Sequence, residues 1–357
     1  MQVAVLGAGA GGLAVAYEWA SRGNDVSLYS HEDHAQEVRA VQARGGIQAE
    51  GPLEGFAPVT TATTDIADAL HGADAVFVVT PAYATEIIAR QAREHLRSGM
   101  TVVICPASCV GSLAFKAAAG LDLFDESVLV GETSTLPYAV RATGGVARVF
   151  HRFDRSLYVA AAPRTGNAKV LEVVRQAYPR AEEAAGIFQT TLQNGNPVIH
   201  PAVTLLNAAL IERTAGDFRF YEEGVTPATG YLMAAVDRER MAVASALGVT
   251  LLSEPEIGVQ QGYMREANYT TGYSTAPGFR GIKAQAQLDH RYLTEDVGYS
   301  LVFVTDLARH LGVPTPVMDA VVEIASVVLR RDFRAEGART MARMGLAGFT
   351  REQLATY

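Results

Sequence analysis

The chain has 357 residues, of which 49% are hydrophobic and 19% charged. This balance is typical of globular proteins, and the length favours two domains over a single core. The formal net charge of -8 argues against a nucleic-acid surface and against a polybasic contact with membranes. The two cysteines, Cys105 and Cys109, are too few for a disulfide framework or a four-ligand zinc site, so we expect a reduced, cytoplasmic protein without a bound metal.

A glycine-rich turn close to the start of the chain is the first motif. Residues 2–6 form a short apolar run that indicates a buried parallel strand, and residues 13–23 have helical spacing and end in a glycine. Between them lies a G-x-G-x-x-G pattern, the setting in which this motif binds a dinucleotide. A purely structural glycine turn is the alternative. The residues expected to contact the cofactor here are Gly7, Ala8, Gly9, Ala10 and Gly12.

The end of the second strand, residues 25–29, bears on the choice of cofactor. An acidic residue at this position would accept hydrogen bonds from the ribose 2′-hydroxyl and repel a 2′-phosphate. The chain has Ser30 instead, with Arg39 as one candidate cation, which slightly favours NADP(H). Glu32 argues in the other direction, and this tip could also be solvated loop.

Strand-like and helical segments then alternate. Residues 75–80 and 101–105 read as strands with a helix over about 84–96 between them, which predicts a doubly wound parallel sheet. Ligands of such sheets lie at the carboxyl ends of the strands, so Thr80 and Pro81 are expected to line the cofactor site. Pro81 could equally just end the strand, and the two cysteines are expected to be packing residues.

The sheet is expected to gain antiparallel pieces after residue 128, with strand-like runs at 128–133, 137–141, 147–150 and 156–161. Arg141 could face an anionic substrate, although a surface arginine is the commoner explanation. From about residue 185 the pattern becomes helical, with helices expected over 227–247, 294–311 and 315–329. The sequence therefore predicts a Rossmann-type α/β domain over residues 1–185 and an all-helical domain over residues 186–357, with the substrate in the cleft between them.

A histidine stands where the composition changes. His200 follows a polar, turn-prone stretch, and an imidazole titrates near neutral pH, as a general acid–base group must. Asn196 lies four residues earlier, on the same face of a helix, where asparagine could also be only a cap. Pro201 disfavours helical backbone at His200 and so predicts a helix entrance or a kink there. Taken alone, His200 could be a structural histidine.

A second polar cluster spans residues 289–300. Thr294 looks like a helix cap, which would put Glu295 and Asp296 in a first turn, where acids complement the helix dipole. Asp296 could instead orient an imidazole and stabilise its charged form. Arg291 could bind a substrate carboxylate in a bidentate way.

Together these segments resemble the opine dehydrogenases nearly end to end, and most closely the bacterial members that join 2-oxo acids to amino acids. The resemblance rests on GAGAGG, VTPA, GETSTLPYAVR, NPVIHPAVTLLNAA, EGVTP and RYLTEDV. It implies NAD(P)H-dependent condensation of an amino acid or amine with a 2-oxo acid such as pyruvate. It also implies that His200 is the catalytic histidine, Asp296 its partner, Arg291 the carboxylate-binding arginine and Asn196 an active-site asparagine. Ser30 departs from relatives that carry an acid, so cofactor preference does not carry over.

The same sequence features leave two alternative functions open. Two-domain hydroxyacid or ketopantoate-type reductases use a lysine in the helical domain, where this chain offers Lys283 in a glycine-flanked loop. A dinucleotide-binding protein without catalysis is the other. The expected partners are a small-molecule amino acid and 2-oxo acid, with neither nucleic acid nor membrane, and a homodimer is conceivable through the apolar helix over residues 317–329.

Overall fold

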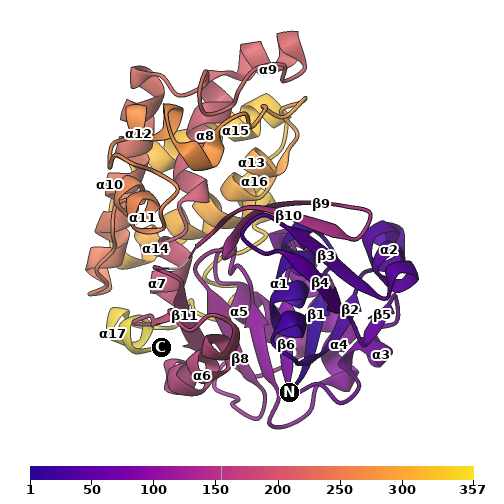
Figure 1. Cartoon of the computed structure of the whole chain (residues 1–357). Coiled ribbons are helices and arrows are strands. Elements are labelled where there is room, and N and C mark those ends of the chain that lie inside the picture. Colours follow the sequence, from indigo (N-terminus) through magenta and orange to yellow (C-terminus); the bar gives the residue numbers. More distant parts are fainter. Residues whose placement is uncertain (154) are drawn as a thin grey trace. The chain divides into compact units, whose positions relative to one another are not determined.

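The computed structural model describes residues 1–153 and 155–357 (Figure 1). The chain divides into two compact units, Met1–Thr190 together with Tyr357, and Thr191–Thr356. In the described part of the chain, no helix is both long and apolar enough to cross a membrane.

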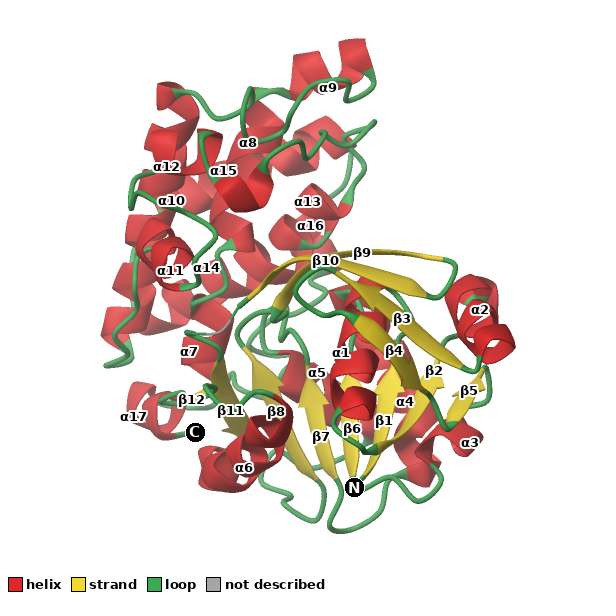
Figure 2. Cartoon of the chain, viewed as in Figure 1, coloured by secondary structure: helices red, strands yellow, loops and turns green. Residues whose placement is uncertain are grey.

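The first unit is built on an eight-stranded sheet with the strand order β12-β11-β8-β7-β6-β1-β2-β5 (Figure 2). Neighbouring strands are parallel except for the pair β11 and β8. The Rossmann-type α/β domain predicted from the sequence is therefore confirmed. The strands are β1 (Gln2–Leu6), β2 (Asp25–Tyr29), β5 (Thr61–Thr63), β6 (Ala75–Val78), β7 (Thr101–Ile104), β8 (Leu129–Thr133), β11 (Tyr158–Ala162) and β12 (Glu182–Glu183).

Helices cover both faces of this sheet, as its near-continuous apolar strands require. One core lies between the sheet and α3, α4 and α5, and the other contains α1 and α6. The helices of this unit are α1 (Ala10–Ser21), α2 (Gln36–Arg44), α3 (Ile66–Leu70), α4 (Ala82–Ala92), α5 (Gly111–Ala119) and α6 (Asn167–Ala177), with short 3₁₀ turns at Glu32–His34, Arg93–His95 and Arg164–Gly166. Helix α7 (Ile187–Leu192) runs across the division between the units.

A second, four-stranded sheet packs over α1, and the sequence did not predict it (Figure 2). Its order is β4-β3-β10-β9. Two of the expected strand runs, now β9 and β10, belong here rather than to the main sheet. The strands are β3 (Gly46–Glu50), β4 (Gly55–Pro58), β9 (Tyr138–Thr143) and β10 (Val146–Arg152).

The described residues of the second unit form helices and loops with a single isolated β-bridge, in agreement with the predicted all-helical domain. Helix α8 packs against α10, α13, α15 and a π-helix at Asp296–Leu301. The helices are α8 (Asn196–Leu206), α9 (Ala208–Thr214), α10 (Pro227–Ala246), α11 (Glu254–Gln260), α12 (Thr271–Ser274), α13 (Arg291–Thr294), α14 (Val302–Leu311), α15 (Pro316–Leu329), α16 (Phe333–Glu336) and α17 (Arg351–Thr356), with a 3₁₀ turn at Pro277–Phe279.

One helix prediction was wrong in detail, and one of the two alternatives predicted for His200 is excluded. The expected helix over 294–311 is split into α13, the π-helix and α14, and His290 rather than Thr294 caps its start. His200 is not at a helix entrance, because α8 continues through Pro201. Proline removes one helical hydrogen bond and disfavours helix at the preceding residue, but buried apolar neighbours hold α8 together here.

Candidate active site

The glycine turn of the first unit has the geometry that a dinucleotide needs. Gly7 has φ +120°, and a Cβ there would lie 2.3 Å from the carbonyl oxygen of Val79. A Cβ on Gly12 would lie 1.7 Å from the carbonyl oxygen of Gly7, so helix and strand touch at this point. Around Gly9, no described residue beyond its two chain neighbours has a heavy atom within 4 Å of a Cβ position. The turn is thus closed on its protein side at Gly7 and Gly12 and open at Gly9, where a pyrophosphate approaches the backbone.

The other predicted cofactor residues lie at the carboxyl ends of neighbouring strands. Thr80 follows β6, and its buried hydroxyl has no hydrogen-bond partner among the described residues. Pro81 directly precedes α4 as its N-cap residue. Ser30 follows β2 but is buried, and its hydroxyl donates to the carbonyl oxygen of His34 at 2.9 Å. Ala8 is also buried, and Ala10 begins α1.

The cysteines pack in the core of the first unit without a disulfide. Burial raises the pKa of the Cys105 thiol to about 12, so this group is not a thiolate near neutral pH. Both residues therefore have the packing role predicted from the sequence.

In the second unit, His200 and Asp296 are brought together from positions 96 residues apart. The His200 Nδ1 lies 2.8 Å from Asp296 Oδ2, and both side chains are almost fully buried. Because an ionised carboxylate only accepts, Nδ1 carries the hydrogen and Nε2 of the neutral ring is left as the acceptor. Asp296 thus orients the ring and would stabilise its protonated form.

Tyr221 is the hydrogen-bond partner of the other ring nitrogen of His200. Its hydroxyl lies 3.1 Å from His200 Nε2. Burial raises the pKa of Tyr221 well above its usual value, with further contributions from Tyr292 and nearby carboxylates, so the phenol stays protonated and can donate to Nε2. Asp296, His200 and Tyr221 therefore form one hydrogen-bonded row along which a proton can move.

Aromatic rings hold this row in place. Tyr292 stacks on the His200 imidazole with ring centroids 3.8 Å apart and an interplanar angle of 20°. Phe220 contacts both of these rings, at 6.1 Å from His200 and 4.9 Å from Tyr292. Tyr221 in turn stacks on Phe279, with centroids 4.0 Å apart.

The π-helix begins at Asp296 itself, and π-turns inside helices recur at functional sites. The wider turn changes the direction in which the side chains after α13 point, which is why spacing arguments for a regular helix from Thr294 failed. Neither Tyr221 nor Tyr292 was predicted as a site residue from the sequence, although Tyr292 stands in the same RYLTEDV segment as Arg291 and Asp296.

Arg291 lies at the start of α13, and its Nε is 3.2 Å from Glu295 Oε2. Its side chain is half exposed, with 47% of its surface accessible, which suits a cation that meets a substrate. Asn196 is the first residue of α8, and the cap is Gly195, so its predicted capping role was wrong. No protein group in the described ranges engages the Asn196 side-chain amide.

Arg141 and Lys283 are surface residues. Arg141 lies on β9 of the first unit, where it donates to the carbonyl oxygen of Val140. Lys283 is 71% exposed and pairs with Asp217 at 2.6 Å, far from the buried surroundings of a catalytic lysine. The reductase alternative, which needs such a lysine, finds no support here.

Fold and site define a dinucleotide-dependent oxidoreductase with a histidine–aspartate pair in a helical domain. Residues 183–329 match the family model for the α-helical domain of NAD/NADP octopine/nopaline dehydrogenases, and residues 2–107 match that for the N-terminus of NAD-dependent glycerol-3-phosphate dehydrogenase. The chain is 34% identical to the opine dehydrogenase of Arthrobacter sp. (strain 1C), over 97% of this chain and 96% of that protein. It therefore belongs to the opine dehydrogenase family, which confirms the resemblance and the enzyme class expected from the sequence.

Solved structures share the fold over the whole chain. A structure of octopine dehydrogenase in complex with NADH and agmatine superposes with a TM-score of 0.79 at 20% identity, covering 100% of this chain and 98% of that one. The NADP+-bound structure of yersinopine dehydrogenase superposes with a TM-score of 0.72 at 17% identity, covering 99% of this chain and 96% of that one.

Proposed function

We propose that this enzyme condenses the amino group of an amino acid or amine with a 2-oxo acid such as pyruvate, and reduces the product to an N-(carboxyalkyl) amino acid. The observation that carries the proposal is the buried row of Asp296, His200 and Tyr221. A reductive condensation must add protons to the carbonyl oxygen twice, first to form a carbinolamine and then to release water, and a positioned imidazole does this near neutral pH.

The roles of the residues follow from this chemistry. As the amine nitrogen attacks the carbonyl carbon, protonated His200 gives its Nε2 proton to the Tyr221 oxygen, and the Tyr221 hydroxyl donates its own proton to the carbonyl oxygen. Asp296 stabilises the imidazolium before the transfer. The nitrogen then returns one proton to His200 along the same row. A second protonation of the hydroxyl expels it as water and leaves an iminium ion. Arg291 pairs with the carboxylate of the oxo acid. Asn196 binds the substrate through its amide, and Arg141 is an additional candidate for a substrate carboxylate.

We assign dinucleotide binding to residues 1–185 and the acid–base residues to residues 186–357. The open backbone at Gly9 and the orphaned Thr80 hydroxyl fit a dinucleotide whose pyrophosphate lies on the turn of Gly7, Ala8, Gly9, Ala10 and Gly12. Pro81 and Ser30 border the same site. When bound, NAD(P)H supplies the hydride that reduces the iminium carbon.

An assay that follows NAD(P)H oxidation with each 2-oxo acid, in the presence and absence of a panel of amino acids and amines, tests this function. We expect oxidation that requires both partners and a secondary-amine product by mass spectrometry. Oxidation that proceeds equally well without an amine would indicate a hydroxyacid-forming reductase. Cofactor binding without turnover on any pair would indicate a binding protein.

We propose NADP(H) as the preferred cofactor, with Arg39 rather than Ser30 as the residue that binds the 2′-phosphate. A cavity of about 180 Å³ beside the end of β2 is lined by Glu32, Arg39, Thr63 and neighbours. Arg39 pairs with Glu32, and both side chains are more than half exposed, so the pair can open at small cost. A phosphate would replace the Glu32 carboxylate as the partner of Arg39.

Replacing Arg39 with alanine is expected to raise the KM for NADPH about tenfold and to leave the KM for NADH nearly unchanged, since a charge-assisted hydrogen bond contributes roughly 1.5–3 kcal/mol. Replacing Glu32 with glutamine should have the opposite effect and lower the KM for NADPH, because it removes a competing carboxylate. Initial rates with both cofactors, for the two variants and the original chain, measure this. Equal losses for NADH and NADPH in Arg39→Ala would contradict the assignment.

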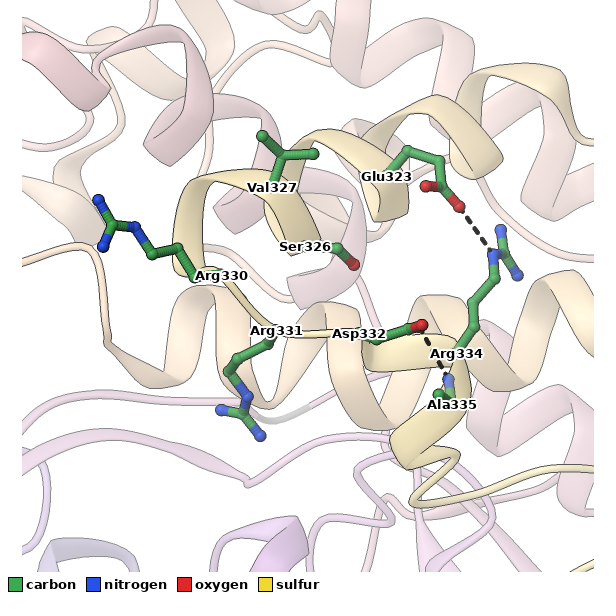
Figure 3. A pocket seen from close by; sticks show the side chains of 8 residues that line it. All are labelled: Glu323, Ser326, Val327, Arg330, Arg331, Asp332, Arg334 and Ala335. Carbon is green, nitrogen blue, oxygen red and sulfur yellow. Dashed lines mark hydrogen bonds and ion pairs between the residues drawn. The ribbon is translucent and has the colours of Figure 1, made fainter.

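We also propose that the enzyme is a cytoplasmic homodimer that pairs through α15. Ile324, Val327 and Val328 on this helix are exposed, Val327 by 76%. Beside them a cavity of about 690 Å³ is lined by the residues labelled in Figure 3, with Glu323 before Val327 and Arg330 after it. Antiparallel pairing of two copies about a twofold axis would set each Glu323 near an arginine of the partner copy. Sedimentation equilibrium tests the dimer, and cell fractionation the location.

A further inference from the structure

Proton transfer to the carbonyl oxygen leaves one requirement of the reaction unmet. At neutral pH an amino donor arrives mainly as an ammonium ion, which has no lone pair for the attack. A base must remove one proton before the nitrogen can attack. His200 cannot easily do this while it is protonated to donate to the oxygen, so a second titratable group is needed near it.

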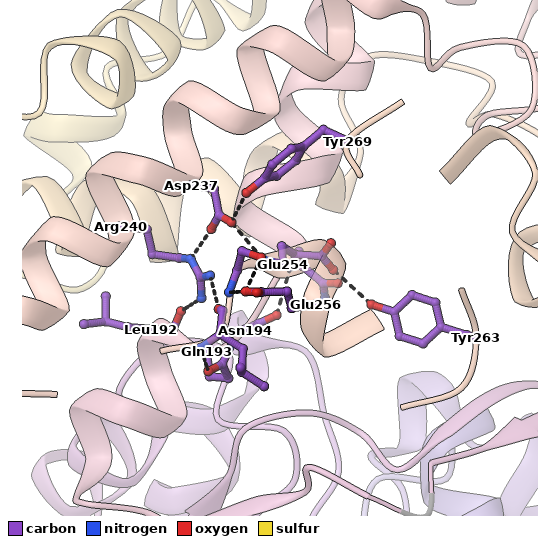
Figure 4. Close-up of polar contacts among 12 residues, drawn as sticks. Leu192, Gln193, Asn194, Asp237, Arg240, Glu254, Glu256, Tyr263 and Tyr269 are labelled. Atoms are coloured by element: carbon purple, nitrogen blue, oxygen red, sulfur yellow. Dashed lines mark hydrogen bonds and ion pairs between the residues drawn. The ribbon is translucent and has the colours of Figure 1, made fainter. Parts of the chain in front are cut away.

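Glu254 is a buried carboxylate with the properties that such a base requires. It stands at the start of α11, is 2% exposed, and accepts a hydrogen bond from the Tyr263 hydroxyl at 3.0 Å through Oε1 (Figure 4). Its other oxygen, Oε2, is buried and has no hydrogen-bond partner among the described residues. A buried carboxylate oxygen without a donor is costly unless the group is neutral or meets a cation.

The nearby arginine does not supply this cation. Arg240 binds Asp237 Oδ1 through Nε at 2.6 Å, and its remaining nitrogens donate to the carbonyl oxygens of Leu192 and Leu252. Asp237 is itself saturated, because its Oδ2 also accepts from the Glu254 backbone N–H and from the Tyr269 hydroxyl (Figure 4). The charge of Arg240 is thus balanced by Asp237, and Glu254 remains as a second carboxylate.

Glu254 is also close to the residues of the acid–base row. A Cβ placed on Gly195 would lie 2.4 Å from its Cγ, so its side chain rests on the residue that caps α8. Gly195 precedes His200 by five residues, which is roughly 7.5 Å along a helix axis. On the other side, Tyr263 contacts Phe279 with ring centroids 4.9 Å apart, and Phe279 stacks on Tyr221.

We propose that Glu254 binds the ammonium group of the amino donor through Oε2 and removes one of its protons. In this step the N–H bond breaks, the proton passes to the carboxylate, and the nitrogen keeps the electron pair with which it attacks the carbonyl carbon. After hydride reduces the iminium ion to a neutral secondary amine, protonated Glu254 returns the proton to that amine, so the product leaves as an ammonium ion and Glu254 is regenerated. The inference rests on the proposed function and deepens it.

The electrostatic surroundings suit this role. Burial and then the charge of Asp237 raise the pKa of Glu254 to about 8, against the smaller opposing effects of Tyr263 and Arg240. The other groups near it are the neutral phenols of Tyr221 and Tyr269. A base is most effective when its pKa lies near the working pH and near that of the group it deprotonates.

The test compares the pH profiles of Glu254→Gln, the matched control Glu256→Gln, and the original chain. For the original chain, kcat/KM for the amino donor should rise with pH and level off at about 8. For Glu254→Gln, kcat/KM for the amino donor should be about a hundredfold lower at pH 7. It should keep rising beyond pH 8, because this variant depends on neutral amine from solution. The KM for the oxo acid and the Kd for NADPH should not change. Glu256 is exposed in the cap of α11, so its variant should behave like the original chain.

The variant Tyr263→Phe tests whether the role of Glu254 is catalytic or structural. Loss of the hydroxyl that donates to Oε1 should move the break in the profile above pH 8, because that hydrogen bond lowers the pKa of Glu254. A Glu254→Gln enzyme with the same profile as the original chain, or with an equal deficit at every pH, would overturn the proposal. If the original chain forms no opine from any pair of substrates, the proposed function fails and the inference fails with it.

Thermal unfolding serves as the check on folding. A carboxyl whose pKa is raised in the folded protein contributes stability below its ordinary pKa and loses it as the pH rises through about 8. Glu254→Gln carries no such charge, so its Tm at pH 9 should be equal to or higher than that of the original chain. Lost activity at an undiminished Tm then reflects the chemistry and not misfolding.

Discussion

Replacing His200 with alanine is expected to lower kcat for opine formation by about a hundredfold to ten-thousandfold, the usual contribution of a positioned acid–base group. The variant loses the group that protonates the carbonyl oxygen, and it leaves Asp296 as a buried carboxylate that has lost its 2.8 Å partner. The Kd for NADPH should be unchanged, because the glycine turn belongs to the other unit. Stopped-flow or steady-state NADPH oxidation measures the rate, and fluorescence titration measures the binding.

A second histidine of the same unit provides the control. His310 lies at the end of α14, is exposed and bonds the carbonyl oxygen of Phe349 at 2.7 Å. His310→Ala should retain the original kcat even where its Tm falls slightly. Unchanged turnover in His200→Ala, or an equal loss of activity in both variants, would refute the catalytic assignment.

The elements that could be predicted are those whose local pattern agrees with their final environment. Strands β1 and β2 were predicted to the residue, since each is a short, mostly apolar run that ends at a turn. Helix α10 was predicted to within one residue, because Pro227 marks its start and the pattern holds for 20 residues. In both cases local preference and tertiary packing point the same way.

The second sheet could not be predicted because its pairings are long-range. Strand β3 pairs with β10, about a hundred residues further on, and its short sequence GIQAE is only partly apolar. The segments of β9 and β10 were predicted as strands. However, nothing in the local sequence distinguishes a strand that covers α1 from one that extends the main sheet. Register and sheet membership are set by partners that the local sequence does not contain.

The candidate site was predictable only in part. His200, Asp296 and Arg291 were identified because they are titratable or charged residues at or near the predicted starts of helices. The resemblance to the opine dehydrogenases then assigned their roles. Tyr221 and Glu254 were out of reach, since a tyrosine or glutamate in a helical segment is usually packing or surface. What makes them distinctive is burial next to His200 or Gly195, and such neighbours come from folding and not from spacing. The π-helix after α13 is likewise set by packing against α8 and α15.

Replacing Asp296 with asparagine is expected to lower kcat by roughly a thousandfold, in line with the loss of about ten-thousandfold when the aspartate of a Ser-His-Asp triad is exchanged in this way. The amide keeps the shape of the side chain but can donate to Nδ1 instead of accepting from it. The ring then carries its hydrogen on Nε2, against Tyr221, and its protonated form loses the neighbouring negative charge. The wrong tautomer, rather than a change of structure, causes the loss.

A complementary experiment uses a double variant. Because Asp296 acts through His200, combining Asp296→Asn with His200→Ala should cost no more than His200→Ala alone, as is found for groups that act as one unit. Asp289→Asn, on an exposed residue seven positions earlier, should leave kcat unchanged. Additive losses in the double variant would mean that Asp296 serves the reaction independently of His200, for instance by holding Arg291. The row of Asp296, His200 and Tyr221 would then not act as one unit.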